Sequence, residues 1–325
     1  MNIIFYVFIA ILIPLLLYAF VIYLSENILL KYVEKYSKYY SSWPKYYLLV
    51  YTAGIASALQ SFLPGLLVDI LGKAKLAFYF QLYNVALDYT VTLGTFILAF
   101  NFNKGIIDKN LLVYITISYI LELIFLSTKV ITYFDGIILY LSFIIMSIII
   151  FYKYRTKKEK IEYKEENSLY SYFKALVYTL EIGLAVSLIY VGGNVLNNIS
   201  NTLSNLGFSI PLIGFLIAII LFTLPDIIYG HLSWFKEKDL NTSIASITGE
   251  EISEFTIFTG ILAMIHPIVF TNIDVIPIIS TMSIMYVSIL ILFFSSYRGK
   301  IPRWVGIILI VLGLLMGFVD GIVNI

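Results

Sequence analysis

Long apolar stretches separated by short polar segments dominate the hydrophobic pattern of this chain. Each stretch is roughly 18–25 residues long, the length that an α-helix needs to cross the hydrocarbon core of a bilayer. Backbone polar groups in lipid must be satisfied within the segment, so each stretch is expected to be a helix. Ten spans are predicted, near residues 3–24, 47–72, 76–101, 111–127, 131–152, 171–196, 208–231, 244–270, 272–294 and 303–324.

The charged segment Lys153–Glu166 divides these spans into two sets of five. An odd number of spans would place the second set in the membrane with the opposite orientation, and such inverted repeats are common in secondary transporters. We therefore expect an all-α integral membrane protein with interrupted helices at its centre. Its expected parts are a first five-span repeat over 1–152, a basic cytoplasmic linker over 153–168 and a second, inverted repeat over 169–325.

The distribution of lysine and arginine predicts how the chain is oriented. If alternate loops are assigned to the cytoplasm, all but three of the 21 Lys and Arg residues fall on that side, the exceptions being Lys73, Lys75 and Lys129. This bias fits the positive-inside rule, and it places both termini outside a cell membrane. The polar, uncharged segment Gly192–Asn205 is then an expected external loop, and it contains the glycosylation sequon that begins at Asn198.

Composition supports the membrane assignment and limits the chemistry. Of the 325 residues, 60% are hydrophobic and 13% are charged, whereas soluble domains carry about 25% charged residues. Cysteine is absent, which excludes disulfides, thiolate metal sites and a cysteine nucleophile. The net charge of +1 gives no sign of a nucleic-acid partner. The expected partners are the lipid bilayer and small inorganic cations, with no cofactor.

Acidic residues inside the predicted spans are the main candidates for function. Glu250 and Glu254 lie one helical turn apart in the eighth span, and Asp226 follows Pro225 in the seventh. Ionisable groups within a membrane span are costly and usually mark an ion or proton path. Carboxylate oxygens only accept hydrogen bonds when ionised, and several of them suit a hard cation. Transport is therefore favoured over chemistry on a bond.

A related polar pattern occurs in both halves of the chain. In each half a proline lies late in one span, and two polar residues four positions apart lie in the next. A proline inside a helix removes one backbone donor and frees nearby carbonyls, and such interruptions at matching places of two halves point to a transporter site. A glycine follows six residues after the second polar residue each time. The first set is Ser61, Pro64, Asn84, Asp88 and Gly94; the second is Thr223, Pro225, Glu250, Glu254 and Gly260.

This pattern resembles the sodium/calcium exchanger (cation/calcium antiporter) superfamily. The two repeats of that family carry a Thr-Ser-Leu-Pro-Glu-like break followed by a Gly-Ser-Asn-x-x-Asn/Asp-like helix. The resemblance implies that Asp226 lies on the family's ligand glutamate, Glu250 on its serine, and Glu254 on its carboxylate or amide. Ten spans, external termini and a basic central loop are also similar to that family.

The first repeat departs from the family pattern. Gly65 stands at the position of the family's ligand glutamate, so one central carboxylate is missing. Asn84 falls on the family's serine, and Asp88 falls on its asparagine. Asp69, one turn after Gly65, is a candidate to replace the missing carboxylate in part. The expected site is therefore asymmetric, with Asp88 opposing the carboxylates of the second repeat.

The resemblance implies a secondary antiporter, not an enzyme, which exchanges a divalent cation, expected to be Ca²⁺, for Na⁺ or H⁺ by alternating access. Spans one and six would move against a core of spans two, three, seven and eight. Having more acids and fewer hydroxyls than the sodium-coupled pattern favours H⁺. The expected ion-binding residues are Asp226, Glu250, Glu254, Asp88, Asn84, Thr223 and Ser61, of which the four acids would ligate the metal, with Asp69, Glu181 and Glu251 as further candidates.

Other functions remain open at this point. Gly65 would also fit a non-transporting, exchanger-like cation sensor. Adjacent Glu250 and Glu251 resemble a diglutamate intramembrane protease, a membrane-embedded hydrolase, but that pattern wants an arginine at position 255, which is phenylalanine. The acids could equally form a structural polar network. Three further acids near span ends are expected at the membrane interface, and they are Glu122, Asp135 and Asp320.

Overall fold

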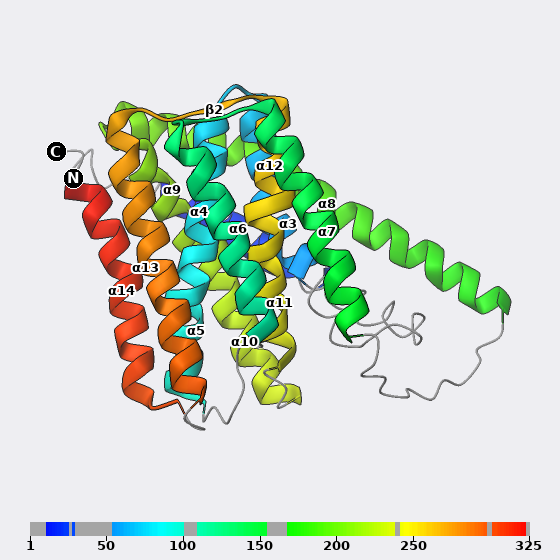
Figure 1. Cartoon of the computed structure of the whole chain (residues 1–325). Coiled ribbons are helices and arrows are strands. Elements are labelled where there is room, and N and C mark those ends of the chain that lie inside the picture. Colours follow the sequence, from blue (N-terminus) through cyan, green and yellow to red (C-terminus); the bar gives the residue numbers. More distant parts are fainter. Residues whose placement is uncertain are drawn as a thin grey trace, which may run out of the picture.

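The computed structural model describes residues 11–25, 28–29, 54–100, 109–154, 168–237, 241–297 and 301–322. The described part of the chain is a bundle of long helices with one pair of very short strands at one end (Figure 1). Most of the predicted linker and all of 30–53 lie outside the described residues.

The helices of the first half follow the predicted spans closely. Successive segments within one apolar stretch, such as α4, η2 and α5, form one continuous rod because a π-helical turn separates two α-helical parts. The elements are a helix at Ile11–Ser25, α3 at Gly54–Ile70, α4 at Ala74–Leu87, η2 at Asp88–Thr92, α5 at Leu93–Ala99, α6 at Lys109–Ser127, β1 at Val130–Ile131 and α7 at Tyr133–Tyr154.

The second half is also helical, with one short strand. It begins with one very long helix, which extends away from the bundle past α7 in Figure 1. The elements are α8 at Ser168–Asn205, α9 at Ile210–Ala218, η3 at Ile219–Thr223, α10 at Leu224–Glu237, α11 at Asn241–Ser253, η4 at Glu254–Phe258, α12 at Thr259–Ile265, β2 at Ile268–Val269, α13 at Asn272–Tyr297 and α14 at Arg303–Ile322.

The prediction of an external loop at Gly192–Asn205 was wrong, because these residues form the last turns of α8. The segment is polar, but it contains no proline, so nothing in it stops a helix that has already begun. The helix ends instead just before Gly207, whose φ of +89° suits glycine at the end of a helix.

The predicted interruptions take the form of π-helical turns rather than breaks. α3 continues through Pro64 without a gap, and η3 ends at Thr223, just before Pro225. Each π-helical turn is five residues long, and η2 and η4 begin at Asp88 and Glu254, the two acids that correspond in the sequence pattern. Single π-helical turns inside α-helices are frequent at functional sites.

Two close glycine contacts hold the rods against their neighbours. A Cβ on Gly94 of α5 would lie 2.9 Å from the carbonyl oxygen of Gly306 on α14. A Cβ on Gly260 of α12 would lie 2.7 Å from the carbonyl oxygen of Gly136 on α7. The two predicted glycines therefore lie inside helices, where they let two backbones approach closely.

The strand pair closes one end of the bundle. Val130 pairs with Val269 and Ile131 with Ile268 in antiparallel register. At the same end Lys75 forms an ion pair of 3.0 Å with Asp274, and Lys73, Lys75 and Lys129 all lie in or next to turns there. We call this end the β1–β2 end.

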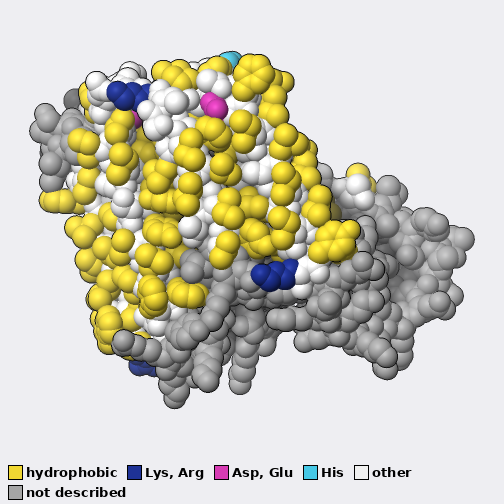
Figure 2. All heavy atoms as spheres, in the orientation of Figure 1, with side chains coloured by type: hydrophobic (Ala, Val, Ile, Leu, Met, Phe, Trp, Pro, Cys, Tyr) yellow, Lys and Arg dark blue, Asp and Glu magenta, His cyan; other side chains and the backbone are white. Residues whose placement is uncertain are grey.

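The surface and the core confirm an all-helical membrane protein. Five of the described helical rods are long and apolar enough to cross a membrane, and four shorter helices are also apolar. Figure 2 shows hydrophobic side chains over the described face of the bundle, with the few visible charges near its two ends. α4 lies at the centre, where all but one of its residues are buried.

Candidate cation site

Three acids from three different rods meet in the middle of the bundle. Asp88 begins η2, Asp226 lies in the first turn of α10, and Glu250 lies on α11. One carboxylate oxygen from each lies within 4.8 Å of the other two, and all three residues are buried. The predicted ligands from the two halves of the chain are therefore brought together, an arrangement that could hold a metal ion.

Glu254 joins this group through two polar side chains of the first half. The Ser61 hydroxyl on α3 and the Asn84 amide on α4 both donate to its Oε1 atom, the latter at 3.2 Å. The same Asn84 amide donates to Oε1 of Glu250 at 2.7 Å. We call Asp88, Asp226, Glu250 and Glu254 the carboxylate cage.

Two cage partners were not predicted from the sequence. Gln60 on α3 donates from its amide to both oxygens of Asp226, at 2.9 and 3.0 Å, and Thr92 donates to Asp88 at 2.9 Å. Gln60 directly precedes Ser61, so a polar pair on an apolar helix was the signal available. Thr92 lies four residues after Asp88, the spacing at which helical side chains meet.

The cage has more acceptor oxygens than donors. Buried oxygens without a hydrogen-bond partner remain on three cage acids and on three neighbouring polar residues, although buried polar groups are usually paired. The groups that act on Asp88, Glu250 and Glu254 are other carboxyls and neutral donors, with no lysine or arginine of the described residues among them. These oxygens are Oδ2 of Asp88, Oε2 of Glu250, Oε2 of Glu254, Oδ1 of Asn84, Oε1 of Gln60 and Oγ1 of Thr223.

The π-helical turns position the cage. At η4 the Thr259 hydroxyl donates to the main-chain oxygen of Glu254, five residues earlier, at 2.7 Å. A π-helical turn inserts one extra residue, so it rotates the following helix relative to the preceding one. Thr223, the last residue of η3, is fully buried one turn before Asp226, so its position follows the prediction.

The three further candidates from the sequence, Glu251, Asp69 and Glu181, are not members of the carboxylate cage. Glu251 is almost fully buried beside Glu250 and Glu254, and neither of its carboxyl oxygens accepts a hydrogen bond. Asp69 is buried near the β1–β2 end, where its Oδ1 lies 3.0 Å from Nδ1 of His266. Glu181 lies on α8, half-buried. Asp69 and Glu181 are not among the acids that the structure groups around a metal.

Position 65 lies away from the cage. A Cβ added to Gly65 would meet Ala77 of α4 at ordinary distances of 3.7–3.9 Å. Ala77 precedes Asn84 by two helical turns, about 10 Å along the helix axis at 1.5 Å per residue. Position 65 is away from the acids because α3 continues as a regular helix through Pro64. The residues of α3 that reach the acids are therefore Gln60 and Ser61, about one turn before Gly65.

Glu122, expected near the membrane interface, lies five residues before the end of α6 and has a completely buried side chain, which was not predicted from the sequence. Ile115, Ser118 and Glu122 form the buried stripe of α6, at spacings of three and four residues, and a polar residue on this stripe was the missed signal. Asp135 is half-buried, and it caps α7 by accepting a hydrogen bond from the Thr132 backbone at 2.8 Å. The side chain of Asp320 lies outside the described residues.

Neither histidine reaches the cage. His231 bonds the main-chain oxygen of Ile227 at 2.7 Å and packs against Phe96 and Phe100. His266 is paired with Asp69. The side chain at position 255 is a buried phenylalanine, so the features expected of a diglutamate protease do not gather around Glu250 and Glu251.

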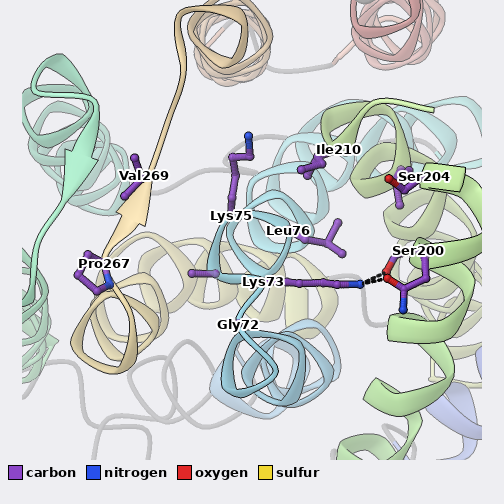
Figure 3. Close-up of a pocket in the computed structure, with 12 residues that line it drawn as sticks. Gly72, Lys73, Lys75, Leu76, Ser200, Ser204, Ile210, Pro267 and Val269 are labelled. Carbon is purple, nitrogen blue, oxygen red and sulfur yellow. Dashed lines mark hydrogen bonds between the residues drawn. The ribbon is translucent and has the colours of Figure 1, made fainter. Parts of the chain in front are cut away.

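A pocket at the β1–β2 end is a separate feature. Gly72, Lys73, Lys75, Ser200 and Pro267 are among its lining residues (Figure 3). Lys73 points toward α8, where its ammonium group donates to Ser200 at 3.3 Å and to Asn201 at 2.5 Å. Burial lowers the pKa of the Lys73 ammonium. Two lysines line this pocket, so it is unsuitable for a cation. The hydrogen bonds of Lys73 connect α8 to the turn between α3 and α4.

Comparisons with known proteins agree with this fold. Residues 177–316 match the family model described as sodium/calcium exchanger protein. No curated protein matches the sequence of the chain.

Solved structures of the sodium–calcium exchanger NCX_Mj share the fold. The form soaked with 10 mM Na⁺ and zero Ca²⁺ superposes with a TM-score of 0.62 at 16% identity, covering 94% of this chain and 98% of that one. The form soaked with 2.5 mM Na⁺ and 0.1 mM Ca²⁺ gives 0.60 at 16% identity, covering 94% and 97%. The family model covers the second half, and the shared fold covers nearly the whole chain. The second half of the chain is therefore similar to the sodium/calcium exchanger family, and nearly the whole chain shares the fold of NCX_Mj.

Proposed function

We propose that this protein is a secondary antiporter that exchanges Ca²⁺ for Na⁺ or H⁺ by alternating access. The observation that supports this most is the carboxylate cage, in which four buried acids from both halves of the chain meet and three of them leave an oxygen without a hydrogen-bond donor. Ca²⁺ takes six to eight oxygen ligands and prefers carboxylates and carbonyls. NCX_Mj, which shares the fold, is described as a sodium–calcium exchanger.

The mechanism is competition for the cage. Acids this close disfavour one another's ionisation, because like charges repel in a site with little water. A divalent cation relieves that repulsion, and protons or Na⁺ relieve it in its absence. The ion that leaves and the ion that enters therefore use the same carboxylates, which couples the two movements.

An excess of acids over hydroxyls favours H⁺ as the counter-ion. Glu251 lies beside the cage as a fifth buried carboxyl, whereas the hydroxyls that bond cage acids from α3 are those of Ser57 and Ser61. A carboxylate can take up a proton directly, but a hydroxyl can only coordinate a metal ion.

The architecture that we propose is two inverted repeats of five spans, 1–152 and 169–325, joined by the basic linker 153–168. The matching π-helical turns at Asp88 and Glu254 support it. So do the glycine contacts, since the third rod packs on the last helix, α14, and the eighth packs on the fifth, α7. We further propose that the β1–β2 end faces the cell exterior with both termini, because only three of the 21 Lys and Arg residues, Lys73, Lys75 and Lys129, are assigned to that side.

The test is Ca²⁺ flux in proteoliposomes that contain the purified protein and an internal Ca²⁺ indicator. A Na⁺ gradient or a pH gradient should drive Ca²⁺ movement, and Glu254→Gln should reduce it at least tenfold, because the cage then lacks one charge. The matched control is Asp135→Asn, the same change of a carboxyl to an amide at a helix cap outside the cage.

The control variant should transport at the wild-type rate. If neither gradient moves Ca²⁺ through the wild-type protein, the antiporter proposal is wrong. If the wild type transports and Glu254→Gln does so equally well, the cage is not the transport site.

A further inference from the structure

Glu122 is a buried acid that the proposed cage does not use. It lies on α6, five residues before the end of that helix at Ser127, and its side chain is fully buried. Neither of its carboxyl oxygens has a hydrogen-bond partner of normal geometry. An isolated ionised carboxylate in such a place is very costly, so the group must hold a proton or a cation.

The group beside Glu122 is the Thr259 hydroxyl at the start of α12. That hydroxyl lies within hydrogen-bonding distance of two acceptors, the side-chain oxygen of Gln81 on α4 at 3.2 Å and the main-chain oxygen of Glu254 at 2.7 Å. Gln81 is itself buried, and its amide nitrogen has no partner. Glu122 is thus linked through one hydroxyl to the π-helical turn that carries a cage ligand.

Among the residues that the structure describes, no charged side chain compensates Glu122. Burial and the Thr259 hydroxyl are the influences that act on its carboxyl. Asp274 on α13 pairs with Lys75 instead, and Glu254 is connected only through its main-chain oxygen. The titratable residues on the described elements packed against α6 are Tyr133, Asp135, Tyr140, Tyr152, Lys153, Glu250, Glu251, Glu254, Asp274 and Tyr286.

We propose that Glu122, Thr259 and Gln81 form a proton-binding site beside the carboxylate cage, and that its proton is one of the counter-ions of transport. This inference rests on the proposed antiport. The site lies between the cage and the β1–β2 end. Thr259 follows Glu254 on the rod that leads to β2, and Glu122 lies near the end of α6 that leads to β1.

Hydrogen-bond arithmetic links this proton to the cage. The Thr259 hydroxyl has one hydrogen and can accept as well as donate. When Glu122 is protonated, it donates to Thr259, which is then free to donate to the Glu254 main-chain oxygen. When Glu122 loses its proton, its carboxylate competes for the Thr259 hydrogen, and the carbonyl at the start of η4 loses its donor. Protonation of Glu122 therefore biases the backbone that positions Glu254.

The decisive variant is Glu122→Gln, which imitates the protonated acid and cannot titrate. Protons released on Ca²⁺ binding are measured in weakly buffered detergent solution, which needs no transport. Wild-type protein should release protons, and Glu122→Gln should release about one fewer per molecule while still binding Ca²⁺, as linkage requires. Thr259→Val keeps the Glu122 carboxyl but removes the hydroxyl that connects it to the Glu254 main chain, so proton release by this variant should also fall. Asp135→Asn is the matched control and should match the wild type.

Equal proton release by Glu122→Gln and wild type would overturn the inference. Lost Na⁺ binding with unchanged proton release would also overturn it, and would assign the site to Na⁺. If wild-type protein binds no Ca²⁺, the antiporter proposal fails separately, and the infrared carbonyl band of protonated carboxylic acids then tests Glu122 alone. That band should weaken in Glu122→Gln at neutral pH, and an unchanged band would show that Glu122 is not protonated. A melting temperature close to that of the wild type shows that the variant is folded.

Discussion

At the scale of single residues, the ion site depends on which neutral side chains hold the acids in place. The Gln60 amide donates hydrogen bonds to both carboxyl oxygens of Asp226. The Asn84 amide donates to both Glu250 and Glu254. These amides donate to carboxylates without neutralising them, so the negative charge of the cage is kept for an ion. The family's first-repeat carboxylate, absent at Gly65, has no substitute on α3, where Gln60 and Ser61 donate hydrogen bonds instead.

Gln60→Glu tests this arrangement. The substitution replaces a donor to Asp226 by another acid of almost the same shape, so two carboxyls would meet in a buried site and repel. We expect a lower melting temperature in the absence of divalent ions and a larger rise on adding Ca²⁺ than in the wild type, since a ligand that binds only the native state stabilises it.

Gln60→Met is the matched control for this variant, because it removes the donor without adding charge. A Ca²⁺-dependent rise in Gln60→Glu no larger than that of wild type or Gln60→Met would argue against a place for Gln60 at the ion site.

At the scale of elements, close glycine contacts fix the rods that carry the acids. Gly260 lies six residues after Glu254 and touches the backbone of Gly136, so α12 and α7 approach more closely than side chains would allow. Without a hydrophobic driving force between helices in lipid, such packing is a main source of helix association. The position of Glu254 therefore depends on a contact two turns away.

Gly260→Ala should destabilise the protein. The new Cβ would lie 2.7 Å from the Gly136 carbonyl oxygen, and overpacking of this kind costs about 1–3 kcal/mol. Thermal melting in detergent measures the change. Gly183→Ala on α8 is the control, because a Cβ there meets nothing within 4 Å, and it should melt at or above the wild-type temperature. Equal melting of the two variants would contradict the role given to the α12–α7 contact.

At the scale of the whole molecule, the two ends of the bundle carry different numbers of cations. Of the described residues, three cations lie at the β1–β2 end, namely Lys73, Lys75 and Lys129. The opposite ends of α6, α7, α10 and α14 carry four, namely Lys109, Lys153, Lys236 and Arg303. α8 reaches the β1–β2 end with its last turns, where Lys73 bonds Ser200 and Asn201. If lysine-rich loops face the cytoplasm, this end is external.

Cysteine labelling tests the orientation, because the natural chain has no cysteine. Asn198→Cys, exposed near the end of α8, should react with an impermeant maleimide added to intact cells. Lys153→Cys, exposed at the end of α7, should react only after the membrane is opened. Labelling of Lys153→Cys from outside with protection of Asn198→Cys would reverse the proposed topology.

The sequence by itself determined the helical membrane class and the four acids of the carboxylate cage, because the cost of placing charges and unpaired backbone in lipid leaves few alternatives. Asp88, Asp226, Glu250 and Glu254 were predicted as ligands for this reason, and the structure brings them together. The end of α8 was misjudged, because polarity predicts a loop only where a residue also stops the helix.

Tertiary structure decided which uncharged and distant residues join the acids. Gln60 meets Asp226 across 166 residues of sequence, and Glu122 is buried against Thr259 rather than exposed at a span end. One-dimensional patterns show how polar a helix is, but not which neighbouring helix faces its polar residues. That depends on the rotation and depth of each rod, which the π-helical turns and the close glycine contacts set.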